Sequence, residues 1–314
     1  MKIVSTVLLV CALCAVAAAQ TKRYEERAGL NGVIRAVRTE VEELMPGGVE
    51  NTSGRRVPVQ AVSYDARGNK AKQVDFNPDG TASQTFVYAF DAEGRAVGYE
   101  EFSGAMTVPR KHVYTLDEAG RRVEYKIVQP DGSAGDRYSY KYDSGGRLAE
   151  ESLFEHKGKP ISRSVYTYDA RGRQAARIGY NPDGSVSSIT RRTYDARGRL
   201  AELLRLDGRL LTYRVRYTYD RSGRVLEQET EGSALDEDMP SAEAHAPGRV
   251  VYVYKGKGRP SEAVAYDPDG SVRERVLIEY DSRGNWVKKT RVPRNAGSGG
   301  GVPQRVEYRS IEYF

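Results

Sequence analysis

The chain has almost no cysteine, and this excludes several ways of stabilising an exported protein. The only two, Cys11 and Cys14, lie in a mainly apolar N-terminal segment. This segment starts with Met1 and Lys2 and ends in the small residues 17–19, which is typical of an export signal cleaved before Gln20. The mature protein would then have no thiol, disulfide or cysteine metal site. We therefore expect an exported protein, periplasmic or extracellular, held together by strand pairing and packing.

Long hydrophobic runs are also scarce. The longest, residues 3–16, is shorter than the roughly 20 residues that a spanning helix needs, so we expect no membrane span after signal removal. An outer-membrane barrel is a rival interpretation, because the chain is exported, rich in strands and ends in Phe314. Lipid-facing strands keep one face apolar, whereas segments such as residues 288–291 place charge on both faces. The sequence therefore favours a soluble protein.

Signatures of catalysis are missing as well. His112, His156 and His245 lie far apart without partner spacing, and we expect them at the surface. The sequence contains no nucleophile elbow, phosphate loop, dinucleotide fingerprint or zinc-protease motif. We therefore predict that the protein is not an enzyme and has no catalytic residues, no metal and no cofactor.

Neither sign of charge dominates. The chain has 49 Lys and Arg against 43 Asp and Glu, for a formal net charge of +6. The two signs are interspersed, so the sequence shows no single cationic arm and predicts no specific nucleic-acid partner. The small positive excess permits an anionic partner such as a polysaccharide or another envelope polymer.

What the chain does have is a repeat. The motif aromatic-Asp-x-x-Gly-[Arg/Asn] recurs, with variations, mostly every 26 residues. Such self-similarity indicates a repeat architecture. The Asp position of the nine copies is occupied by Asp65, Asp91, Asp117, Asp143, Asp169, Asp195, Asp220, Lys255 in a degenerate copy, and Asp281.

Each unit contains two turns. The Asp-x-x-Gly motif provides a side-chain acceptor and a glycine where the chain needs a positive φ. Midway in most units a second turn follows, clearest as Asn-Pro-Asp-Gly at residues 77–80 and 181–184. Both turns suit tight hairpins with a bulge at Gly. The predicted structural turn residues are Asp65, Gly68, Asp91, Gly94, Asp143, Gly146, Asp169, Gly172, Asp195, Gly198, Asp220, Gly223, Asp281 and Gly284.

The stretches between turns alternate as strands do. Phe86, Tyr88 and Phe90 fall on one face, and no stretch of ten residues in the mature chain has a convincing helical stripe. We predict an all-β fold, a long antiparallel meander of about eighteen strands that is curled or partly spiralled. Residues 33–44 would form the first strand and residues 305–313 the closing strand.

The predicted organisation has four parts. Residues 1–19 are the signal peptide, and residues 20–55 form an N-terminal strand and loop that cap the array. Residues 56–290 hold the nine units, with an acidic insertion at residues 229–247. Residues 291–314 form a Gly-rich loop and the closing strand.

The repeat resembles the YD repeat of Rhs proteins. Tyr-x-Tyr-Asp-x-x-Gly-Arg, as at residues 166–173 and 217–224, carries the resemblance, which covers about residues 56–290. The resemblance implies a curled or spiralling β-sheet and an association with carbohydrate binding. In the large members the sheet is a shell around a toxic C-terminal domain, for which this chain has no room after its last motif. It is similar to the small exported bacterial members.

The recurring residues have two interpretations each. The Asp residues are expected to cap turns, rather than to form a calcium ladder, since each turn offers one carboxylate and calcium needs six to eight oxygens. The Gly-Arg arginines are expected to stack on neighbouring tyrosines, or else to line a stripe for anionic sugar or phosphate. The tyrosines either pack the sheet or stack on sugar rings. The candidate ligand face consists of Tyr166, Tyr168, Tyr194, Tyr213, Tyr217, Tyr219, Arg147, Arg173, Arg199 and Arg224.

These observations favour an exported, non-enzymatic binding scaffold. It would contact glycan, an envelope polymer or another exported protein through one Tyr- and Arg-rich face of the sheet. The alternative is a structural protein that assembles with itself through exposed sheet edges and turns. A shell or partner component of a toxin system is a third interpretation.

Overall fold

The computed structural model describes residues 30–43, 55–104, 106–232, 246–256, 258–294 and 305–314. The predicted signal peptide, most of the acidic insertion and most of the Gly-rich loop lie outside these residues. Among the described residues, no helix is long and apolar enough to cross a membrane.

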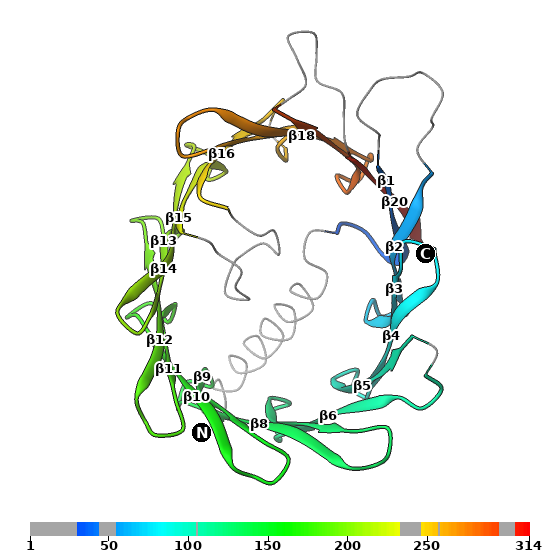
Figure 1. Ribbon diagram of the computed structural model, residues 1–314, viewed down its shortest axis with the longest axis vertical. Coiled ribbons are helices and arrows are strands. Elements are labelled where there is room, and N and C mark those ends of the chain that lie inside the picture. Colours follow the sequence, from blue (N-terminus) through cyan, green and yellow to red (C-terminus); the bar gives the residue numbers. More distant parts are fainter. Residues whose placement is uncertain (1–29, 44–54, 105, 233–245, 257, 295–304) are drawn as a thin grey trace, which may run out of the picture.

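Twenty strands form a single antiparallel sheet that closes on itself (Figure 1). Each strand pairs with the next one in sequence, as the short turns of the repeat dictate. The first strand, β1 (Ile34–Glu43), pairs with β2 (Val57–Tyr64) on one side and with the last strand, β20 (Arg305–Tyr313), on the other. The other strands are β3 (Lys70–Phe76), β4 (Ala82–Phe90), β5 (Ala96–Ser103), β6 (Arg110–Leu116), β7 (Arg122–Val128), β8 (Ala134–Tyr142), β9 (Leu148–Phe154), β10 (Pro160–Tyr168), β11 (Gln174–Tyr180), β12 (Val186–Tyr194), β13 (Leu200–Asp207), β14 (Leu210–Tyr219), β15 (Val225–Gly232), β16 (Gly248–Val253), β17 (Glu262–Tyr266), β18 (Val272–Tyr280) and β19 (Trp286–Pro293).

The predicted all-β antiparallel meander is confirmed, and its curled sheet forms a closed barrel rather than a spiral. The nine units supply β2 to β19, which accounts for the eighteen strands expected. The two strands outside the units, β1 and β20, then pair with each other over nearly their whole length, for example Val37 with Ile311 and Val41 with Glu307. This pairing converts the meander into a closed barrel.

Closure removes the free edges on which the self-assembly interpretation depended. Every one of the twenty described strands has a hydrogen-bonded neighbour on both sides. Because an antiparallel barrel leaves no row of unpaired backbone groups, it offers no template for adding a strand from another chain. Assembly through sheet edges therefore has no basis in the described part of the chain.

The two kinds of turn lie at opposite ends of the barrel. Every Asp-x-x-Gly turn joins an even-numbered strand to the next strand, as Asp169 does between β10 and β11, whereas the Pro-Asp-Gly turns follow odd-numbered strands. Successive strands run in opposite directions, so all turns of one kind lie at the same end. We call the end that carries the Asp-x-x-Gly turns the YD rim.

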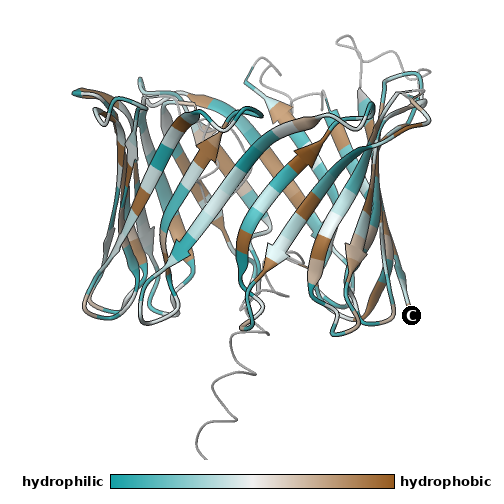
Figure 2. Cartoon of the chain, turned by 90° about the horizontal axis from the view of Figure 1, so that it is seen from below, coloured by the Kyte–Doolittle hydropathy of each residue, from teal (hydrophilic) through white to brown (hydrophobic). Residues whose placement is uncertain are grey.

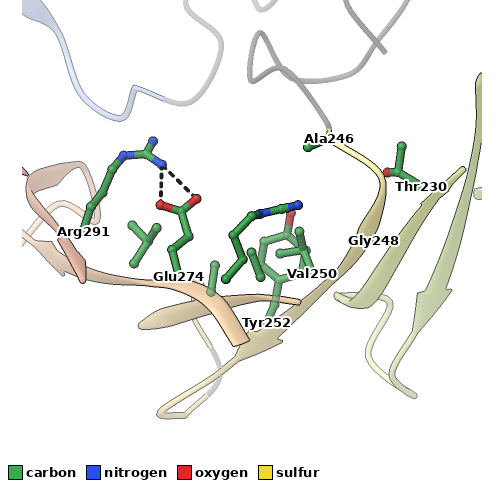
Figure 3. A pocket seen from close by; sticks show the side chains of 11 residues that line it. Thr230, Ala246, Gly248, Val250, Tyr252, Glu274 and Arg291 are labelled. Atoms are coloured by element: carbon green, nitrogen blue, oxygen red, sulfur yellow. Dashed lines mark hydrogen bonds and ion pairs between the residues drawn. The ribbon is translucent and has the colours of Figure 1, made fainter. Parts of the chain in front are cut away.

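Directly paired residues share a face of the sheet, which separates an inner wall from an outer wall. Gly248 and Val250 on β16 line a hollow on the concave side (Figure 3). Gly248 is paired in register with Thr230, Thr230 with Val215, and Val215 with Leu203, so these residues lie on the same concave side. Val215 and Leu203 have no exposed surface, so the inner wall is the better buried of the two.

The outer wall is charged around the barrel. Lys141 on β8 pairs with Glu150 on β9 at 2.7 Å, and Arg275 on β18 pairs with Glu262 on β17 at 2.8 Å. Similar pairs link Lys111 to Glu100 on β6 and β5. Figure 2 shows hydrophilic residues over the full height of the wall. Ion pairs therefore link neighbouring strands on the outer wall at several places around the barrel.

Candidate functional site

The turns of the YD rim are built around the repeated aspartate. In the Asp169 turn, the carboxylate accepts hydrogen bonds from the backbone N–H groups of Arg171 and Arg173 and from Nε of Arg173 at 2.7 Å. The hydrogen bond from the Arg173 guanidinium is the main reason why the pKa of Asp169 is lowered. Gly172 completes the turn at φ +78°, a conformation that favours glycine. The same Asp–Arg ion pair recurs as Asp91–Arg95, Asp117–Arg121, Asp143–Arg147, Asp195–Arg199 and Asp220–Arg224.

Five of these rim arginines, all except Arg95, also stack on the tyrosine of the next unit. The guanidinium carbon of Arg173 lies 4.1 Å from the ring centre of Tyr194, and the Tyr194 hydroxyl donates to the Gln174 carbonyl at 2.8 Å. The unit is thus linked to its neighbour by a cation–π contact and a hydrogen bond, while the ion pair holds the arginine to its own turn. The other stacked pairs are Arg121–Tyr142, Arg147–Tyr168, Arg199–Tyr219 and Arg224–Tyr254.

This network holds much of the ligand face predicted from the sequence. Arg147, Arg173, Arg199 and Arg224 form ion pairs with their own turn and contact Tyr168, Tyr194, Tyr219 or Tyr254. These contacts join unit to unit, so the four arginines and the tyrosines they cover are engaged by the fold itself.

The remaining predicted residues are not part of the rim. Tyr213 is 1% exposed and packs with Leu203 and Val215, so the prediction that it belongs to an exposed ligand face is wrong. Tyr217 packs against the same cluster, and burial raises its pKa. Tyr166 donates its hydroxyl to Glu151 at 2.8 Å. The structure therefore divides the predicted face among three places.

A different set of rings lines the inner wall across β4 to β8. Phe86, Tyr99, His112, Tyr125 and Tyr138 follow one another at intervals of 13 residues, half a repeat, and we call them the aromatic row. The rings of Tyr99 and His112 are stacked, with centres 4.0 Å apart and planes at 9°. The other successive centres are 6.0, 5.8 and 5.3 Å apart. The row is one contiguous aromatic strip across five strands.

Two further tyrosines and an arginine border the row. Tyr88 and Tyr114 lie 5.6 and 6.4 Å from Tyr99, measured between ring centres. The guanidinium of Arg122 lies 3.7 Å from the ring centre of Tyr114. These neighbours widen the strip along the strands and place a cation beside it.

A hydrogen-bonded chain runs through the middle of the row. His112 Nε2 lies 2.9 Å from Glu101 Oε2, and His112 Nδ1 lies 2.6 Å from the Tyr125 hydroxyl. Burial lowers the pKa of His112, and burial raises the pKa of Tyr125. At neutral pH the imidazole is therefore neutral, donating from Nε2 to the Glu101 carboxylate and accepting at Nδ1 from Tyr125.

The sequence interpretation missed this chain and was wrong about His112. The side chain is buried at 5% exposure instead of lying at the surface. The available signal was the interval of 13 residues that places it in line with Tyr99 and Tyr125. Beyond Tyr138 the same interval leads to Glu151, Ser164, Arg177 and Thr190, so the row ends after β8.

A hollow on the opposite part of the inner wall lies over β15 to β19 (Figure 3). Its floor holds small and apolar side chains such as Val250 and Ala265. Glu274 and Arg291 point into it and form an ion pair at 3.4 Å. In the described part of the chain, no group of three or more His, Cys, Asp or Glu side chains is placed to hold a metal ion.

Comparisons with known proteins identify no family for this chain. No family model and no curated protein matches the chain. A porin-like protein from Bacteroides uniformis aligns over 90% of this chain and 99% of its own, at 12% identity and a TM-score of 0.42. The TcdB2–TccC3 complex and the Photorhabdus luminescens Tc holotoxin pore align at 13% identity each, with TM-scores of 0.30 and 0.31. The alignment with the TcdB2–TccC3 complex covers 81% of this chain and 16% of that chain. The alignment with the holotoxin pore covers 87% of this chain and 18% of that chain. The YD-repeat family therefore remains a resemblance of motif.

Proposed function

We propose that this chain is an exported, non-enzymatic scaffold that binds a glycan or another envelope polymer on the inner wall of its barrel. The observation that carries the proposal is the aromatic row of β4 to β8. The rim network recurs from unit to unit and serves the fold, whereas the row is confined to five strands. A local feature that closure of the sheet does not require is a better candidate for recognition.

The chemistry of the strip suits a hydroxyl-rich ligand. The ring faces of Tyr99, His112, Tyr125 and Tyr138 are stacked on one another, and the Tyr125 hydroxyl donates to His112. A ligand would therefore meet the ring edges and the oxygen atoms of the hydroxyls, which can still accept a hydrogen bond. Phenol hydroxyls both donate and accept hydrogen bonds, as sugar hydroxyls do. Sugar recognition here would thus use hydrogen bonds from a preformed wall.

The proposal that the protein is not an enzyme is supported by the state of the titratable groups in the row. General acid–base catalysis works best when a pKa lies near the operating pH. Burial shifts the pKa of Tyr125 upward and that of His112 downward, so both groups stay neutral at pH 7. The Glu101–His112–Tyr125 chain is better suited to fixing the orientation of the rings.

The charged outer wall supports a barrel surrounded by water. A lipid-facing strand needs an apolar outer face. Arg275 and Arg163, near the middle of β18 and β10 on the outer wall, have side chains 53% and 47% exposed. A barrel with 16 to 18 strands or more leaves a water-filled lumen or one that is plugged. The proposal places a polymer segment in such a lumen, against the inner wall.

Binding to defined glycans tests the proposal. The full-length chain would be titrated with peptidoglycan fragments, lipopolysaccharide and neutral and sulfated oligosaccharides over a range of salt concentrations. Tyr114→Ala should weaken binding about tenfold, the loss typical of an aromatic anchor. Thr115→Ala, on the exposed outer face of the same strand, is the matched control and should bind as the parent does. Absence of saturable binding to all of these ligands would overturn the proposal.

A further inference from the structure

The inner wall of β18 to β20 carries more positive than negative charge. Lys289, Arg291, Arg305 and Arg309 face inward on these strands, together with the carboxylates of Glu274 and Glu307, and Glu43 of the neighbouring β1 is paired in register with Arg305. The outer wall differs, because its arginines and lysines typically face a carboxylate on the neighbouring strand, as Arg275 faces Glu262. The excess on the inner wall points to a ligand that brings negative charge.

Two of the cations stand directly opposite each other. Arg291 on β19 is paired in register with Arg305 on β20. Like charges in directly opposed positions destabilise a sheet. Both guanidinium groups share Glu307, with nitrogen–oxygen distances of 3.5 and 3.4 Å. Glu307 therefore contacts both arginines, and Glu274 at 3.4 Å also pairs with Arg291.

Arg309 is the least compensated of the four. Its guanidinium lies 3.8 Å from the ring centre of Trp286, and Lys289 lies 4.7 Å from the same ring. Its Nε is buried, and no described residue accepts a hydrogen bond from it. Burial lowers the pKa of Arg309 to about 10. The charge of Glu307 offsets part of this effect, but among the described residues Arg309 forms no close ion pair. A partly desolvated cation costs free energy, which an anion would offset.

We propose that the inner wall of β18 to β20 binds the carboxylate or sulfate groups of an acidic glycan. Arg309 would receive one anionic group beside Trp286, and the Arg291–Arg305 pair a second one. Guanidinium groups fit planar and tetrahedral oxyanions with paired hydrogen bonds. The inference rests on the proposed function, that glycans bind inside the barrel, and adds the class of glycan and the site that selects it.

Nucleic acid, the other polymer with regular negative charge, fits the inner wall less well. Proteins that hold single strands stack the bases on open aromatic faces. Here the aromatic row stacks on itself, and two cations cover Trp286. The anionic groups of a sugar chain need no such platform.

The single tryptophan makes the site observable. Trp286 is the only one in the chain, so its fluorescence reports on binding at β19 and β20 alone. The full-length chain would be titrated with a heparin-derived hexasaccharide, an oligogalacturonate, a neutral oligosaccharide and a single-stranded oligonucleotide at physiological salt. We expect a saturable fluorescence change with the two acidic glycans and a weaker response to the other two.

Charge-matched variants separate the site from general attraction. Arg309→Gln should weaken binding of the acidic glycans at least tenfold, as loss of a buried charge partner does. Arg275→Gln removes the same charge from the outer face of β18, where the side chain is exposed, and should change binding less than twofold. Arg309→Gln should unfold at a temperature no lower than the parent, because it removes an uncompensated charge. Circular dichroism would verify that each variant is folded.

Specific results would overturn the inference. Equal weakening by Arg275→Gln would mean that net charge alone attracts the ligand. Equal or tighter binding of the neutral sugar or the oligonucleotide would exclude acidic glycans as the selected class. If Arg275→Gln weakens binding equally, or if the neutral sugar binds as tightly, the proposed function still holds provided that Tyr114→Ala weakens glycan binding. Failure of every glycan to bind would overturn both.

Discussion

The tyrosines of the YD rim and those of the aromatic row share the inner wall but differ in what they contact. Tyr194 on the rim gives its hydroxyl to a backbone carbonyl, and an arginine of the preceding unit covers its ring. Tyr125 in the row gives its hydroxyl to a histidine, and its ring contacts other rings. The rim contacts recur from unit to unit, whereas the row spans β4 to β8. The same residue type thus holds the units together in one place and forms a local surface in another.

The difference shows how a repeat protein separates stability from recognition. Each unit must connect to the next, so the residues that do this recur at the period of the repeat. Positions that face the lumen at mid-strand do not connect the units, and their residue type varies, as Tyr125, Ser164 and Leu203 show. Recognition is therefore expected where the repeat becomes irregular.

The largest effect should follow from removing a rim tyrosine. Tyr194→Ala removes a ring that is stacked by Arg173 and a hydroxyl bonded to the backbone, and should lower the free energy of unfolding by about 3 kcal/mol. Urea unfolding followed by circular dichroism would measure it. Thr193→Ala, on the exposed outer face of β12, is the control and should stay within about 0.5 kcal/mol of the parent. A small loss for Tyr194→Ala would show that the rim does not hold the units together.

A smaller effect should appear in the pH dependence of stability. Burial lowers the pKa of His112 in the folded state, so between its ordinary value of 6.5 and its folded value the unfolded chain binds more protons. The free energy of unfolding should therefore fall as the pH decreases from 7 through 6.5 towards the folded pKa. His112→Phe should flatten this part of the profile, and replacing the exposed His156 by Asn should leave it unchanged. A parental profile in the His112 variant would contradict the buried neutral state.

The smallest effect concerns the stacking of a rim arginine. Arg173→Lys keeps the charge beside Asp169 but loses the planar group that covers Tyr194. We expect a loss of about 0.5 kcal/mol, the size of a solvent-exposed cation–π contact, in the same urea experiment. Arg171→Lys, on an exposed turn position, is the control. Equal losses of unfolding free energy in the two variants would show that stacking on Tyr194 does not stabilise the rim.

Much of the architecture was predictable because it depends on sequence patterns within a few residues of each other. The Asp-x-x-Gly and Pro-Asp-Gly turns and the alternation between them indicate consecutive antiparallel strands, and β1 and β20 lie within one residue of the predicted segments. His112 was misplaced because its burial depends on Glu101, 11 residues away, and on Tyr125, 13 residues away, across two strand pairs. The interval of 13 residues places His112 in line with Tyr99 and Tyr125, but the burial of the side chain depends on the pairing of three strands.

The sequence by itself determined the strands, their order and the two kinds of turn, since hairpin pairing depends on residues close together in the chain. Only the tertiary structure decided that the sheet closes. Closure depends on the twist that accumulates over twenty strands and on the pairing of Val37 with Ile311, which lie at opposite ends of the chain. It also decided which side chains face the lumen, and with them the aromatic row and the cations of β18 to β20, because inside and outside exist only once the barrel is closed.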